Sequence, residues 1–124
     1  MAKILRENDI RKKEDIILIN ALNRYSRPGE FKKTITYLSE KIGNGDSHVN
    51  FYFWDCLDEY SKTLYDAPFD GVEVDYLDDI QQYNLQDVYH YVSLASQRYI
   101  ELNPNDKDEI EEILDKMKNN FNCE

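Results

Sequence analysis

The sequence has few of the residues on which enzymatic and metal chemistry usually depend. It contains two histidines, His48 in a polar stretch and His90 between two tyrosines on an expected helix surface, and two cysteines. Neither histidine has a cysteine or aspartate at the spacing of a nucleophilic site, and no Cys/His cluster could hold zinc. Residues 70–76 do not match a calcium loop, and the four glycines are too scattered to form a phosphate-binding loop. Paired carboxylates could act as acid and base only if one lay in an apolar pocket, which nothing indicates. We therefore expect a non-catalytic protein without metal or cofactor.

Long apolar runs are also lacking. No stretch approaches the roughly 20 apolar residues of a membrane span, and the acid-containing N-terminus lacks the apolar core of a signal peptide. Cys56 and Cys123 are too few for a disulfide framework and are expected to be free thiols in a reducing compartment. With 41% hydrophobic and 13% aromatic residues, the chain can bury one core. The sequence thus predicts a single domain over residues 1–124, located in the cytoplasm and not bound to a membrane.

Negative charge dominates and is unevenly distributed. The net charge is −10, but residues 1–43 have ten Lys/Arg against six Asp/Glu, whereas residues 44–124 have five against nineteen. Between Asp55 and Asp87 there are ten acidic residues and one basic residue, Lys62. A surface of this kind repels nucleic acid and anionic lipid and attracts a cationic partner. It could also serve only to keep the protein soluble, so charge alone does not decide between these roles.

Apolar residues at helical spacing predict four helices. Gly43 is expected to end the second, and Pro104 the third. Asn84 and Asn105 are expected to cap the third and fourth. The helices cover residues 10–25, 31–42, 85–102 and 106–121. Their apolar faces are Leu18, Ala21, Leu22 and Tyr25; Phe31, Ile35, Leu38 and Ile42; Leu85, Val88, Val92, Ala95, Tyr99 and Leu102; and Ile110, Ile113, Leu114, Met117 and Phe121.

The middle of the chain is less regular. Residues 44–47 are expected to form a loop. The aromatic and β-branched residues 49–54 favour a strand, and residues 55–65 have a helical pattern, although one helix across both segments also fits the spacing. Residues 71–76 alternate between apolar and acidic side chains, which predicts a strand with an acidic outer side. A turn at 77–79 and a returning strand at 80–83 would complete a hairpin.

These elements together predict an α+β fold. We expect a mainly α-helical single domain of about four or five helices with a small antiparallel β-hairpin or sheet.

Tyrosines and acids are interleaved in the same part of the chain. Seven of the ten tyrosines lie between Tyr52 and Tyr91, a stretch that nearly coincides with the acidic one. Tyrosine is a favoured interface residue because it buries a large area at low rotamer cost. Neighbouring carboxylates can pair with Lys and Arg side chains that would otherwise contact phosphates. Some of these tyrosines, Tyr60 and Tyr76 in particular, are expected to fill the core instead.

One part of the chain resembles a known family. The segment Tyr65–Val74, in which Pro68-Phe69-Asp70-Gly71-Val72 leads into a strand, is similar to the CdiI-type immunity proteins of bacterial contact-dependent growth inhibition (CDI) systems. The similarity continues in the helix that ends with Tyr99-Ile100-Glu101-Leu102-Asn103-Pro104 and in the next helix, which opens with Asp106-Lys107-Asp108. It covers residues 65–118. The resemblance implies a cytoplasmic protein that forms a 1:1 complex with the ribonuclease domain at the C-terminus of a CdiA exoprotein. It implies structural roles for Phe69 and Gly71 and no catalytic residue.

The resemblance and the charge pattern lead to one hypothesis. The chain is an immunity protein that neutralises a cognate CDI ribonuclease toxin through an acidic, tyrosine-rich surface, without contacting nucleic acid itself. The alternative, from another class, is an acidic adaptor or nucleic-acid mimic that binds a basic host protein. The candidate toxin-binding residues are Glu73, Asp75, Asp78 and Asp79 at the hairpin, with Asp58, Glu59, Tyr83 and Asp87 as secondary candidates.

Overall fold

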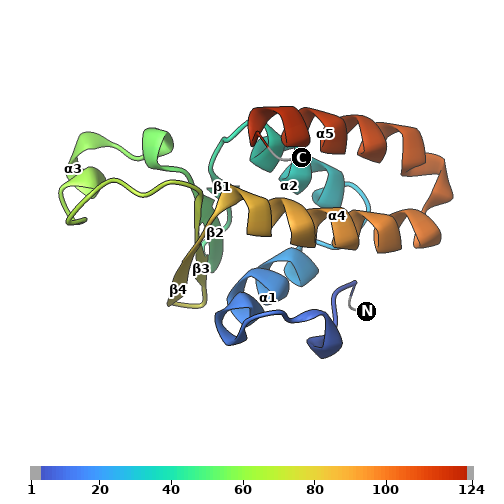
Figure 1. The fold of residues 1–124 in the computed structure, drawn as a ribbon, viewed down its shortest axis with the longest axis horizontal. Helices are drawn as coiled ribbons and strands as arrows, with labels where there is room; N and C mark the ends of the chain where they lie inside the picture. The colour runs from blue at the N-terminus through green and yellow to red at the C-terminus, as the bar shows by residue number, and fades with distance from the viewer. Residues whose placement is uncertain (1–3, 123–124) are drawn as a thin grey trace.

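The longer helices pack together on one side of a small antiparallel sheet (Figure 1). The computed structural model describes residues 4–122, and its strands pair in the order β1-β2-β3-β4. This arrangement confirms the predicted, mainly helical α+β fold. In chain order the elements are α1 (Ile16–Arg24), α2 (Glu30–Ser39), β1 (Asn44–Gly45), β2 (Val49–Tyr52), α3 (Glu59–Lys62), β3 (Val72–Tyr76), β4 (Asp79–Tyr83), α4 (Leu85–Leu102) and α5 (Lys107–Asn120).

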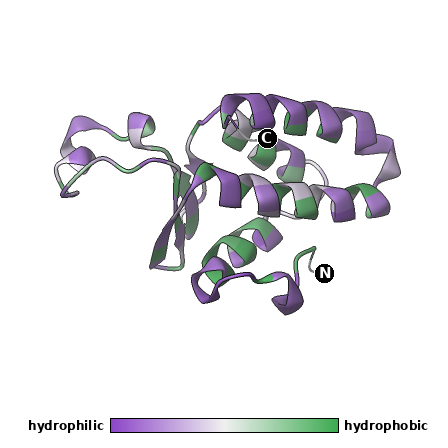
Figure 2. Ribbon diagram, in the orientation of Figure 1, coloured by the Kyte–Doolittle hydropathy of each residue, from purple (hydrophilic) through white to green (hydrophobic). Residues whose placement is uncertain are grey.

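Helix α1 contacts β3, β4 and α4 and is rich in hydrophobic residues (Figure 2). All four of its predicted core residues are buried. The helix begins at Ile16 rather than near Ile10, because residues 7–9 and 13–15 form separate 3₁₀ turns. In each turn an aspartate accepts the backbone N–H three residues earlier: Asp9 from Arg6 and Asp15 from Lys12. Local side-chain bonds of this kind compete with a continuous helix.

Helix α2 ends four residues before the predicted stop at Gly43. Lys41 adopts a left-handed φ of 58°, and the Ile42 N–H donates to the Tyr37 carbonyl at 2.9 Å, which is the closing bond of a Schellman motif. Ile42 therefore lies outside the helix and is 40% exposed. Gly43 has another role, because a Cβ atom there would lie 3.1 Å from the Phe51 carbonyl oxygen of β2.

The two long helices largely follow their predicted patterns. The Asn84 side chain accepts the Asp87 N–H at 2.7 Å and caps α4, as expected. Residues 104–106 form a 3₁₀ turn, so α5 begins at Lys107 and Asn105 is not its cap. The buried faces of α2 and α4 meet where Phe31 and Tyr99 stack, with ring centroids 4.6 Å apart. Leu102, 68% exposed at the end of α4, is the exception to the predicted core.

The sheet contains the predicted hairpin and two further strands. Residues 49–52 form β2, as favoured, and residues 44–45 form the short edge strand β1 where only a loop was expected. Tyr76 pairs with Asp79, which leaves a two-residue connection, Leu77 and Asp78, with φ of 51° and 74°. Positive φ at both positions is typical of a type I′ hairpin turn. Gly71, at φ 94°, is required before β3, because a Cβ atom would lie 2.1 Å from the Tyr83 carbonyl oxygen.

Residues 53–71, which we call the arm, project from the sheet on the side away from the other helices (Figure 1). The helix predicted over residues 55–65 is reduced to the single turn α3. Tyr60 is 73% exposed, so the expectation that it fills the core is wrong, and Leu64 is 70% exposed. The arm is held instead by a cluster of Trp54, Tyr65 and Phe69, whose ring centroids lie 5.5 to 5.6 Å apart.

Candidate protein-binding surface

The sheet has one face that the helices do not cover, which we call the outer face. Residues paired across antiparallel strands point to the same side, so the register defines two rows there. One row is Tyr52, Glu73 and Gln82, and the other is Asn50, Asp75 and Ile80. The core residues Val72 and Val74 point to the opposite side, and both are fully buried.

The first row lies beneath the arm. Glu73 is only 6% exposed: its carboxylate accepts the Tyr65 hydroxyl at 2.5 Å and the Gln82 amide at 3.2 Å. Burial, followed by the hydrogen bond to Glu73, raises the pKa of Tyr65 to about 12. Burial and the charges of Asp75 and Glu73 raise the pKa of Tyr52. Glu73 therefore fastens the arm to the sheet.

The second row and the turn beside it are open. Asp78 and Asp79 are exposed, and Asp75 is partly exposed. Asp75 accepts the Asp78 N–H at 3.0 Å, which stabilises the turn. In the part of the chain that the structure describes, no ion pair involves these three aspartates. They form an acidic hairpin tip whose charge is not neutralised internally.

The arm presents a second acidic site. Asp58 caps α3 by accepting the Ser61 N–H at 2.7 Å, and this bond lowers the pKa of Asp58. The Glu59 side chain is 96% exposed and lies 3.8 Å from the Lys62 ammonium. Figure 1 shows α3 well separated from the turn between β3 and β4, so Asp58 and Glu59 do not join the hairpin tip in one cluster.

Tyr83 and Asp87, the remaining sequence candidates, face inward. The Tyr83 hydroxyl donates to the Glu14 carbonyl at 2.5 Å and accepts the Leu18 N–H at 3.1 Å, and burial raises its pKa. Asp87 is 8% exposed and pairs with Arg11 at 2.7 Å and Lys12 at 3.3 Å. Both residues attach the N-terminal segment to the sheet and α4. Glu73, Tyr83 and Asp87 are thus engaged within the fold, and their contact with a partner stays a prediction.

Several bases of the N-terminal part form ion pairs with acids from the rest of the chain. Besides the Asp87 pairs, Arg24 binds Asp46 at 3.0 Å, and Lys32 lies within 3.4 Å of Asp106 and Glu109. These acids belong to the acidic part of the sequence but are used internally. Within residues 4–122, most of the exposed acids without an ion pair lie at the hairpin tip, on the arm and on α5, and of these only the hairpin tip and the arm adjoin the outer face of the sheet.

Apolar side chains next to these acids were missed by the sequence reasoning. Leu77 is 55% and Ile80 57% exposed at the hairpin tip, and Tyr60 and Leu64 are exposed on the arm. The alternation of the hairpin contains a signal for Ile80, because a residue opposite Asp75 must share its outer side. Exposed apolar residues surrounded by charge are typical of protein–protein contact sites.

Comparison with known families assigns the chain to a family. A family model described as CDI immunity protein matches residues 13–114, most of the chain. The chain belongs to the CDI immunity protein family. Comparison with curated proteins gives no match. The resemblance to this family is thereby confirmed; the match reaches residue 114 of the predicted segment 65–118 and extends to α1, α2 and the first two strands.

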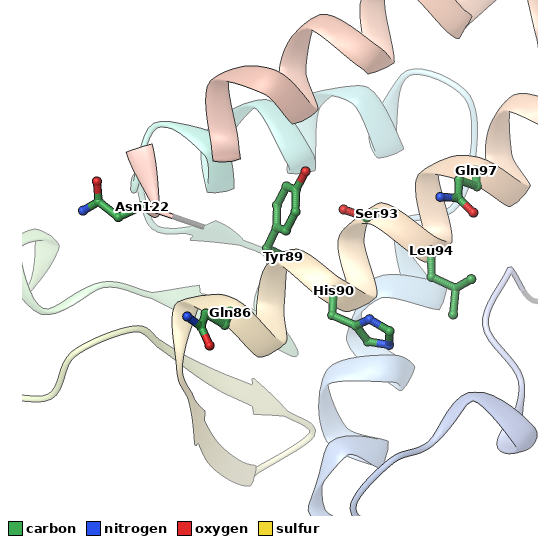
Figure 3. A pocket seen from close by; sticks show the side chains of 7 residues that line it. All are labelled: Gln86, Tyr89, His90, Ser93, Leu94, Gln97 and Asn122. Carbon is green, nitrogen blue, oxygen red and sulfur yellow. The ribbon is translucent and has the colours of Figure 1, made fainter. Parts of the chain in front are cut away.

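An open groove of about 790 Å³ runs along α4 of this immunity-family fold (Figure 3). It includes His90 and Ser93, which with Asp87 are spaced one turn apart on the helix. No hydrogen bond joins these three side chains among residues 4–122, and the buried Ser93 hydroxyl has no partner there. Burial, followed by the charge of Arg11, lowers the pKa of His90. This arrangement is not a nucleophile–base–acid relay.

Within residues 4–122, no group of three or more His, Cys, Asp or Glu side chains is arranged to hold a metal ion. None of the helices described there has the length and apolar character needed to cross a bilayer. Cys56 is exposed and donates to the Lys41 carbonyl at 3.3 Å, whereas Cys123 lies outside the described residues.

Proposed function

We propose that this immunity protein neutralises a cognate CDI ribonuclease toxin domain by binding it 1:1 through the acidic hairpin tip and the neighbouring arm. Membership of the family gives the partner class, a CDI toxin. The observation that supports the surface is the open row Asn50, Asp75 and Ile80 beside three aspartates that no described base neutralises.

The charge of the surface supports a ribonuclease as the toxin. Enzymes that bind RNA use Lys and Arg to neutralise phosphates, so their substrate surfaces are positively charged. An acidic inhibitor is complementary to such a surface and is drawn to it electrostatically. The encounter would take place in the cytoplasm, where the RNA is, and the immunity protein would act by occupation rather than by catalysis.

Three substitutions that remove charge without changing shape test this surface. Asp75→Asn, Asp78→Asn and Asp79→Asn together keep the turn hydrogen bond and the tolerance of position 78 for positive φ. We expect the triple variant to associate roughly ten-fold more slowly at low salt with the catalytically inactivated C-terminal domain of the exoprotein encoded beside this gene. Stopped-flow measurement of association, and survival of cells co-expressing the active domain, give the two readouts.

A matched control uses three exposed acids in the middle of α5. Glu111→Gln, Glu112→Gln and Asp115→Asn make the same change in net charge on another element. We expect this variant to associate and protect like the wild type. If the two triple variants were indistinguishable, the hairpin tip would not be the binding surface; if the wild type failed to bind the domain or abolish its ribonuclease activity, the proposed function would be wrong.

A further inference from the structure

The requirements of folding do not explain why position 77 is a leucine. Its φ of 51° is left-handed, a conformation that costs an L-residue stability and that Gly, Asn and Asp tolerate best. Type I′ turns are accordingly rich in Asn-Gly and Asp-Gly. Burial of the leucine side chain could offset this cost, but Leu77 is 55% exposed.

The hydrogen bonds of the turn do not require leucine either. The Leu77 N–H donates to the His48 carbonyl at 2.9 Å, a backbone bond available to any residue except proline. Asp78 is held by its own N–H bond to Asp75. Unfavourable backbone conformations whose cost is not offset by local packing are concentrated at functional sites.

Ile80 supplies a second exposed apolar side chain beside Leu77. It lies on the outer face in the open row with Asp75 and is 57% exposed. The two apolar residues are interspersed with Asp75, Asp78 and Asp79. An apolar centre with a charged rim is the usual composition of a binding hot spot, in which the centre provides affinity and the rim provides steering.

We infer that Leu77 and Ile80 are the apolar anchors of the toxin complex, inserted into an apolar depression that is bordered by Lys and Arg on the toxin. The inference rests on the proposed function and assigns separate tasks within its surface. The aspartates set the rate of association, and the two apolar side chains set the rate of dissociation. The charge of the rim disfavours an acidic partner for the same face.

The double variant Leu77→Asn, Ile80→Thr tests the anchors. It should weaken binding without lowering the stability of the free protein. Asparagine tolerates positive φ and threonine favours strands, so we expect the free variant to melt at the same temperature as the wild type or higher. We expect its complex with the inactivated exoprotein domain to dissociate at least ten-fold faster, with little change in association. Surface plasmon resonance and thermal denaturation measure the two effects.

Leu102→Gln is the control, because Leu102 is a leucine that is even more exposed than Leu77 and lies at the distant end of α4. It should leave dissociation unchanged. A double variant at positions 77 and 80 that dissociates like the wild type, while the triple asparagine variant associates slowly, would refute the anchors and leave the proposed function intact. Failure of the wild type to bind would refute both.

Discussion

At the scale of single residues, several polar side chains attach the N-terminal segment to the rest of the fold. Arg98 of α4 donates to both carboxylate oxygens of Asp9 and to the Ile4 carbonyl. The hydrogen bond from Arg98 is the main cause that lowers the pKa of Asp9, from 3.8 to about 2. Tyr91, buried in α4, donates to Asp15 at 2.5 Å and accepts the Arg11 N–H at 3.0 Å. Arg98 therefore has a structural role in holding the N-terminal segment against the rest of the fold.

The lowered pKa of Asp9 predicts a pH dependence of stability. A carboxyl group whose pKa is lower in the folded state stabilises the fold fully above its unfolded value, and this contribution is lost as the pH falls toward the folded value. We expect Asp9→Asn to melt a few degrees below the wild type above about pH 4. The difference should shrink between pH 3.8 and about 2. Thermal denaturation followed by circular dichroism measures it.

Glu7→Gln provides the comparison within the same 3₁₀ turn, because Glu7 is exposed and no described residue forms an ion pair with it. It should melt like the wild type at every pH. A difference between Asp9→Asn and the wild type that stayed constant down to pH 2 would show that the lost interaction does not depend on the charge of Asp9.

At the scale of elements, the sequence predicts what periodicity determines and misses what distant contacts determine. Helix α4 and the β3–β4 hairpin follow from spacing, cap and turn residues, because each signal is local. The end of α2 does not, since Lys41 adopts a left-handed conformation that the sequence does not favour. The structure of the arm does not follow from local signals either, because Trp54, Tyr65 and Phe69 meet only in the folded chain. For the same reason the burial of Glu73 beneath Tyr65 could not be foreseen.

The bond between Tyr65 and Glu73 predicts how the arm depends on one hydroxyl group. Tyr65→Phe leaves a buried carboxylate oxygen without that donor, which should cost about 1 to 2 kcal/mol. We expect a lower melting temperature and a shift of Trp54 fluorescence to longer wavelength, because the only tryptophan of the chain packs edge-on against Tyr65.

Tyr60→Phe is the matched control on the same arm. The Tyr60 side chain is 73% exposed, so loss of its hydroxyl should change neither the melting temperature nor the Trp54 spectrum. If Tyr65→Phe behaved like Tyr60→Phe, the aromatic cluster alone would hold the arm.

At the scale of the whole molecule, the uneven charge of the sequence becomes a functional asymmetry. Several bases of the first 43 residues pair with acids such as Asp46, Asp87 and Asp106, whereas the exposed acids of the hairpin tip, the arm and α5 are largely unpaired within residues 4–122. The sequence therefore indicated the correct half of the chain for exposed negative charge. It could not separate the exposed aspartates from Asp87, because that distinction depends on which base folds next to each acid.

This distribution predicts that salt acts on the formation of the complex rather than on its lifetime. Raising NaCl from about 0.1 M to about 1 M shortens the screening length from roughly 10 Å to 3 Å. We expect the association rate with the inactivated exoprotein domain to fall roughly ten-fold or more over this range. Dissociation should change little, because the apolar contacts of Leu77 and Ile80 are not screened by salt. The triple asparagine variant should lose much of the salt dependence, whereas the α5 control should retain it. An association rate that does not respond to NaCl in the wild type would mean that the exposed carboxylates do not guide the toxin to the hairpin tip.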